Sequence, residues 1–101
     1  MDYKFFCHTL EDDVPPEHIS KILQALWHDH KGQWDRAHDM VQVIGSREAS
    51  WVHAYLHRKE GDYGNASYWY NRANRPMYES SLQAEWEEIV RELLQTASAV
   101  T

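Results

Sequence analysis

A short pattern of residues occurs twice in the chain, and the second copy begins 29 residues after the first. Each copy places an alanine, a histidine, a glycine, an aromatic residue and a second alanine at the same relative positions. These residues are Ala25, His28, Gly32, Trp34 and Ala37 in the first copy, and Ala54, His57, Gly61, Tyr63 and Ala66 in the second. A glycine between two stretches of helical periodicity favours a helix, a tight turn and another helix. The sequence therefore predicts an all-α fold with two antiparallel helix-turn-helix repeats.

The periodicity of apolar residues divides the chain into about five helices. We expect helices over residues 16–31, 34–44, 46–60, 65–73 and 80–96, and an extended or irregular arm over 1–15, before the proline pair. Ser46 is expected to cap the third helix, and Gly61 to end it in a left-handed conformation. Ala54 and Ala66 are expected to face each other across the second hairpin. The single domain, 1–101, then comprises the arm, repeat one at 16–44, repeat two at 46–76 and a capping helix at 80–97.

Composition excludes several classes of function. The net charge of −6 argues against non-specific nucleic-acid binding, which needs cationic side chains to neutralise phosphates. The single cysteine, Cys7, excludes an internal disulfide and a cysteine-based zinc cluster. No apolar run approaches the roughly 20 residues that span a bilayer, and none at the N-terminus is long enough for a signal peptide. We therefore expect a cytoplasmic protein that binds neither nucleic acid nor membranes.

The second repeat, Gly61-Asp62-Tyr63-x-x-Ala66-x-x-x-Tyr70-x-x-Ala73, resembles the tetratricopeptide repeat, and the resemblance covers residues 18–76. Ala54 stands where that family has a small residue in its first helix. The first repeat departs further from the pattern, since Val41 and Ile44 replace the aromatic residue and the last alanine. The offset of 29 is shorter than the family's repeat of about 34 residues, and Trp51 is displaced by one position. The resemblance implies a short solenoid that binds proteins or peptides; residues 51–62 also look like the core of small proteins without an assigned role.

One face of the third predicted helix has the composition of a binding surface. Glu48, Trp51, Tyr55 and Arg58 follow one another at helical spacing, and the fourth helix adds Trp69 and Arg72. Aromatic rings supply contact area and guanidinium groups bind carboxylates, so we expect a groove for a protein or peptide with an acidic group. A homodimer through exposed aromatic residues such as Tyr68 and Trp69 is also expected. The alternative is that the aromatic stripe packs in the core.

A second hypothesis concerns metal binding on the same helix. His53 and His57 are four residues apart and Glu60 follows three later, so one helix face offers two imidazoles and a carboxylate. Such a set could hold a divalent metal ion as a cofactor, in a metal-binding protein or a small metal-dependent enzyme. Its glutamate does not lie between the histidines, as it does in the zinc-protease motif. His28 occupies the position equivalent to His57, which favours structural histidines, no cofactor and a non-enzymatic role.

Overall fold

The computed structural model describes residues 1–99, and all of its regular elements are helices. They are α1 (Tyr3–His8), a short 3₁₀ turn η1 (Thr9–Glu11), α2 (Lys21–His30), α3 (Trp34–Gln42), α4 (Arg47–Lys59), α5 (Tyr63–Arg72) and α6 (Leu82–Ala99). No strand occurs in this range, so the all-α class is confirmed, with one α-helix more than the sequence predicted. Within the same residues, no helix combines the length and the apolar character needed to cross a membrane.

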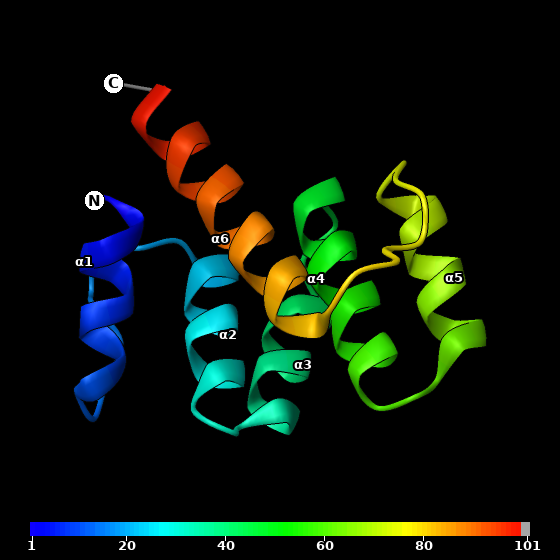
Figure 1. The fold of residues 1–101 in the computed structure, drawn as a ribbon, viewed down its shortest axis with the longest axis horizontal. Coiled ribbons are helices and arrows are strands. Elements are labelled where there is room, and N and C mark those ends of the chain that lie inside the picture. Colours follow the sequence, from blue (N-terminus) through cyan, green and yellow to red (C-terminus); the bar gives the residue numbers. More distant parts are fainter. Residues whose placement is uncertain (100–101) are drawn as a thin grey trace.

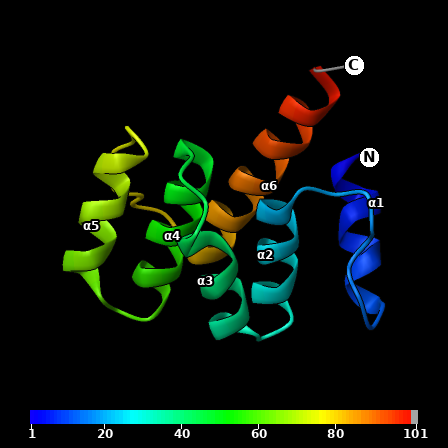
Figure 2. The same ribbon diagram turned by 180° about the vertical axis from the view of Figure 1, so that it is seen from behind.

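The helices form two hairpins that are crossed by the C-terminal helix. α2 packs on α3 and α4 packs on α5, and α3 lies against α4 where the hairpins meet. α6 runs across α2 and α4 on one side of the molecule (Figure 1), whereas α3 lies on the other side (Figure 2). In both views α1 and α5 are at opposite edges. The joint between the hairpins therefore faces away from α6.

The N-terminal segment is helical where the sequence predicted an irregular arm. Asp2 caps α1, because its carboxylate accepts a hydrogen bond from the backbone N–H of Phe5 at 2.7 Å. The ring of Phe6 is buried, with its centroid 6.1 Å from that of Trp86 in α6. The prediction of an extended arm over 1–15 is thus wrong for residues 3–11. The missing information was tertiary, since the anchor for Phe6 lies 80 residues further along the chain.

Side-chain caps decide where the central helices begin. Ser46 Oγ accepts a hydrogen bond from the backbone N–H of Ala49 at 3.1 Å, which confirms the predicted cap of α4. α2 begins five residues later than predicted, at residue 21 instead of Pro16. Ser20 causes the delay, because its extended backbone and its hydroxyl, which accepts from the N–H of Leu23 at 3.2 Å, set the start of the helix.

The two glycine turns have the same backbone geometry. Gly32 has φ of 83° and Gly61 has φ of 84°, so both adopt the left-handed conformation, as predicted for Gly61. In each turn the residue after the glycine donates its backbone N–H to the carbonyl five residues earlier, at 2.9 Å. This pairing is typical of a helix that ends on a left-handed glycine. The internal repeat of the sequence is therefore matched by two equivalent turns.

The repeated alanines lie in the core. Ala25, Ala37, Ala54 and Ala66 are all fully buried. Small side chains at these positions allow the backbones of neighbouring helices to approach closely. The burial of Ala54 and Ala66 agrees with the predicted packing of the second hairpin, although a direct contact between the two stays a prediction.

Candidate functional site

The aromatic face predicted to line a groove is buried. Trp51 and Tyr55 each expose only 3% of their surface. The indole N–H of Trp51 donates to Glu85 Oε2 of α6 at 3.1 Å, and the hydroxyl of Tyr55 donates to Asp29 Oδ2 of α2 at 2.8 Å. Both side chains are therefore core residues whose polar atoms are hydrogen-bonded inside the protein. This is the alternative in which the aromatic stripe packs in the core, and the two rings do not line an open groove.

Arg58 on the same face is held by an internal carboxylate. Its Nε donates to Glu85 Oε1 at 3.0 Å, and Glu85 is completely buried. The hydroxyl of Tyr70 donates to the other oxygen of Glu85 at 2.6 Å, and burial, together with this carboxylate, raises the pKa of Tyr70. Arg58 therefore joins α4 to α6, and its guanidinium is not free to bind the carboxylate of a partner.

The other predicted groove residues lie in two separate places. Glu48 is exposed at the edge of a cleft of about 370 Å³ between the start of α4, the segment after α5, and α6. Trp69 is half-buried on α5, and the guanidinium of exposed Arg72 lies 5.5 Å from the centroid of its ring. The structure thus divides the six predicted residues among the core, the rim of the cleft and α5, where Trp69 faces α4.

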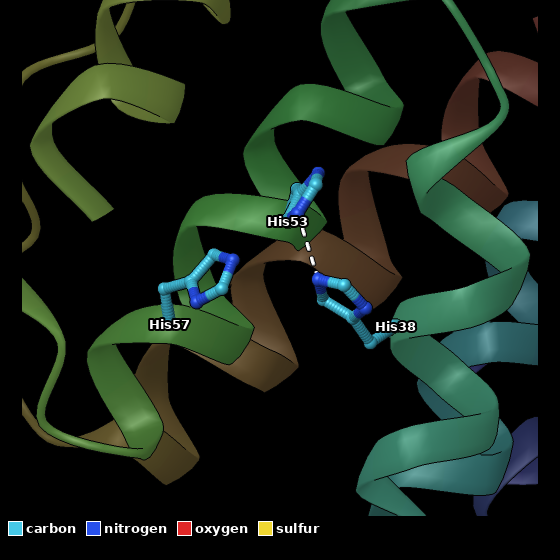
Figure 3. Close-up of side chains that lie close together, drawn as sticks. All are labelled: His38, His53 and His57. Carbon is cyan, nitrogen blue, oxygen red and sulfur yellow. Dashed lines mark hydrogen bonds between the residues drawn. The ribbon is translucent and has the colours of Figure 1, made fainter. Parts of the chain in front are cut away.

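Three histidines converge where the two hairpins meet. His38 comes from α3, and His53 and His57 come from successive turns of α4 (Figure 3). One ring nitrogen from each lies within 4.8 Å of the others, and the Nε2 atoms of His38 and His53 are 3.0 Å apart. His53 and His57 are buried, whereas the side chain of His38 is 21% exposed. We call these residues the three-histidine cluster.

Two tryptophans fix the orientation of the cluster. Trp34 lies parallel to His38, with ring centroids 4.9 Å apart, and Trp69 lies parallel to His53 at 3.9 Å. The indole N–H of Trp34 donates to the carbonyl of Leu56 at 2.8 Å, which fixes that ring against α4. Side chains restrained in this way lose little further conformational entropy when they bind a ligand.

The environment keeps His53 neutral. Burial and, to a lesser extent, the neighbouring His38 and His57, which disfavour a second positive charge, together lower the pKa of His53 to about 4. A neutral imidazole has one lone pair available, and the hydrogen bond between His38 and His53 requires a single proton between two Nε2 atoms. A cation can take the place of that proton when the ring that carried it holds its proton on Nδ1 instead.

Glu60, which the sequence offered as a metal ligand, bonds to a histidine instead. Its Oε1 is 2.9 Å from Nδ1 of His57, so a proton on Nδ1 leaves Nε2 with a free lone pair. One ring nitrogen of His57 is turned towards the other two histidines (Figure 3). Metal-binding histidines commonly donate their second N–H to a carboxylate in this way. His57, Glu60 and Asp62 also offer three atoms within 4.8 Å, but Asp62 caps α5 through the N–H of Asn65.

Sequence reasoning found two members of the cluster and missed His38. The spacing of His53 and His57 was visible on one helix, whereas His38 lies on another helix, outside the repeated pattern. Only the packing of α3 on α4 brings it to the pair. His28, the repeat equivalent of His57, is not part of the cluster, because its Nδ1 is 2.6 Å from Oε1 of Gln33 and this contact satisfies it locally.

Comparison with known proteins adds no functional information for this chain. No protein-family model, curated protein or solved structure matches it significantly. The tetratricopeptide-like assignment therefore stays a prediction, and the three-histidine cluster is the feature from which a function has to be argued.

Proposed function

We propose that the protein binds one divalent transition-metal ion through the three-histidine cluster. The observation that carries this proposal is the convergence of three imidazole nitrogens from two helices within 4.8 Å. Imidazole suits zinc, copper, nickel, cobalt and iron, whereas magnesium and calcium prefer oxygen ligands. The set contains no thiolate, which disfavours copper(I) and iron–sulfur clusters and leaves zinc among the ions that an all-imidazole set suits.

The spacing of the nitrogens supports this proposal. Metal–nitrogen bonds of about 2.0–2.1 Å in a tetrahedral site place two ligand nitrogens about 3.3 Å apart. The Nε2 atoms of His38 and His53 are already 3.0 Å apart. An ion between them would take the place of the shared proton, which would move to Nδ1 of the ring that carried it, so that both imidazoles stay neutral. A rotation of the His57 ring would bring in the third nitrogen. Metal binding therefore requires movement of side chains and no rearrangement of the helices.

The position of the cluster gives the metal a structural effect as well. His38 belongs to the first hairpin, and the other two histidines belong to the second. An ion bound by all three joins the hairpins at the joint opposite α6. Because the unfolded chain does not hold the three side chains together, the ion stabilises the folded state by mass action.

The test is zinc titration of protein purified without a histidine tag and treated with a chelator. We expect one ion per chain by calorimetry and elemental analysis, together with a rise in melting temperature. His38→Gln removes the most exposed ligand and should abolish both effects while the circular dichroism spectrum stays helical. His18→Gln, at an exposed histidine outside the cluster, is the matched control. Equal zinc binding by the wild type and His38→Gln would refute the proposal.

Partner binding is a second candidate function, favoured by the cleft beside Trp51. Here the guanidinium of Arg75 lies 3.5 Å from the centroid of the Trp51 ring and bonds to Glu92 at 2.7 Å. Exposed Arg47 and Glu48 stand at its rim, so the cleft offers both signs of charge to a peptide. In this proposal the hairpins form a tetratricopeptide-like solenoid that acts in the cytoplasm, and α6 lies across α2 and α4 instead of capping the end of the stack.

Light scattering over a range of concentrations tests whether the partner is a second copy of the chain. A dimer that is lost in Arg47→Glu would support self-association through the cleft. A wild-type protein that remains a monomer at high micromolar concentration would remove the homodimer from this proposal.

A further inference from the structure

The three-histidine cluster offers three ligands and no fourth of the usual kinds. Among the described residues, no additional histidine, cysteine, aspartate or glutamate atom joins the set. Glu60 lies at the Nδ1 side of His57. The carboxylate of Asp39 is 3.9 Å from Nδ1 of His38, and so on the side of that ring away from the Nε2 atom that faces His53. Both carboxylates can orient imidazoles but do not share the space between the three rings.

The three histidines of the cluster differ in their exposure to solvent. Trp69 covers the face of the His53 ring, and Trp34 covers a face of the His38 ring. His53 and His57 are buried, whereas part of His38 reaches the surface. His38 is thus the member of the cluster past which a small solute would reach an ion held there.

The charge of the donor set defines the class of solute. Three neutral imidazoles bring no negative charge to the ion itself, and the Glu60 and Asp39 carboxylates behind the rings offset its double positive charge only from a distance. The partly buried surroundings screen that charge less than bulk water does. Zinc sites with three protein ligands keep a position for water or substrate, whereas closed structural sites use four protein ligands. A small anion at the remaining position lowers the net charge of the site.

We infer that the ion in the three-histidine cluster keeps one coordination position open, and that this position binds small inorganic anions from solvent. The inference rests on the metal binding proposed above. It adds a ligand class to that proposal, since an open site exchanges its fourth ligand whereas a closed site serves the fold alone. The anion binds to the metal directly, in place of a water molecule, and no covalent bond of the protein changes.

Cobalt(II) is the probe for this inference, because its visible absorption reports the number and kind of its ligands. We expect the metal-free protein to take up one cobalt ion with visible bands that His38→Gln lacks and His18→Gln retains. Sodium azide should then shift these bands in a saturable manner. Sodium perchlorate at the same ionic strength, as a weakly coordinating salt, should leave them unchanged.

The possible outcomes separate the two proposals. Cobalt bands that form but do not respond to azide would overturn the open position and leave metal binding intact. A lack of both cobalt bands and stoichiometric metal would refute metal binding itself. Bands that azide removes, with release of cobalt into a dialysate, would show that azide extracts the ion, and they would also overturn the inference.

Discussion

The turn that follows α2 and the turn that follows α4 share a left-handed glycine and the same backbone hydrogen bonds, but their histidines have different surroundings. In the first turn His28 contacts Gln33, and the pair is complete in itself. In the second turn His57 contacts Glu60 and joins two further histidines. Two turns with the same backbone conformation thus differ in their histidines: His28 contacts a neighbouring glutamine, whereas His57 belongs to the proposed metal site.

The difference lies in residues outside the repeated pattern. The position equivalent to His53 in the first repeat is Gln24, whose side chain donates to the carbonyl of Ile19 at 3.1 Å. The position equivalent to His38 in the second repeat is Ser67, which is exposed on α5. The repeated residues therefore account for the similar backbone of the two turns. The histidines that meet between α3 and α4 include two, His38 and His53, that lie outside the repeated pattern.

The buried charges of the two hairpins show a similar contrast. Asp29 in α2 and Arg58 in α4 occupy equivalent positions. Asp29 accepts hydrogen bonds from Tyr55 and from Lys59, the latter at 2.9 Å. Arg58 instead donates to Glu85 in α6. Asp29 thus links α2 to α4, and Arg58 links α4 to α6, with charges of opposite sign.

The largest effect is expected from the buried acids. Glu85→Ala leaves Arg58, whose side chain is only 13% exposed, as an unpaired charge and should lower the free energy of unfolding by about 3–5 kcal/mol. Asp29→Ala should cost less, because the side chain of Lys59 is 37% exposed and can rehydrate. Urea unfolding measures both values. Equal losses would show that the two charged links are equivalent after all.

The next effect concerns the two equivalent histidines. His57→Gln removes a proposed ligand and should weaken zinc binding by more than about 100-fold. Changing a residue that only hydrogen-bonds to a ligand typically weakens metal binding by about 10- to 100-fold, so the loss of the ligand itself should be larger. His28→Gln should leave zinc binding unchanged. Calorimetric titration of both variants decides the matter, and a similar loss in the two would place the metal outside the three-histidine cluster.

A smaller effect is expected from the residues that orient these histidines. Glu60→Ala removes the acceptor at Nδ1 of His57 and should weaken zinc binding by about 10- to 100-fold. Gln33→Ala removes the corresponding contact of His28 and should not change zinc affinity. Retained affinity in Glu60→Ala would show that this carboxylate does not position His57.

The smallest effect is expected at the turns, where the two units should respond alike. Gly32→Ala and Gly61→Ala should each lower the free energy of unfolding by about 1–2 kcal/mol, because an alanine is strained at positive φ. A Cβ at either glycine meets no atom within 4 Å, so steric clash adds nothing. Gly64→Ala, in the first turn of α5, is the control and should be neutral or stabilising. Thermal unfolding compares the three, and unequal losses at Gly32 and Gly61 would contradict the equivalence of the turns.

The sequence predicted the features that depend on local interactions. The left-handed turn at Gly61 and the cap at Ser46 follow from the conformational preferences of single residues, and the structure confirms both. The spacing of His53 and His57, two of the three members of the candidate site, was likewise visible, because both lie on one helix. Local patterns carry this information since neighbours in sequence remain neighbours in a helix.

Features that depend on distant segments were not predicted. α1 owes its position to the contact of Phe6 with Trp86, and His38 reaches the cluster because α3 packs on α4. Spacing along the chain does not encode either contact. The burial of Trp51 and Tyr55 was left open, because an aromatic stripe at helical spacing has the same sequence whether it faces solvent or another helix.

The buried carboxylate of Glu85 has a consequence for any partner of this protein. α6 inserts an acidic side chain between Trp51, Tyr70 and Arg58, which are the groups that would otherwise receive the carboxylate of a foreign peptide. The protein thus supplies the occupant of this surface from its own chain, at an effective concentration that a free peptide in solution does not match. A partner that recognises these residues would have to act as a competitor of α6.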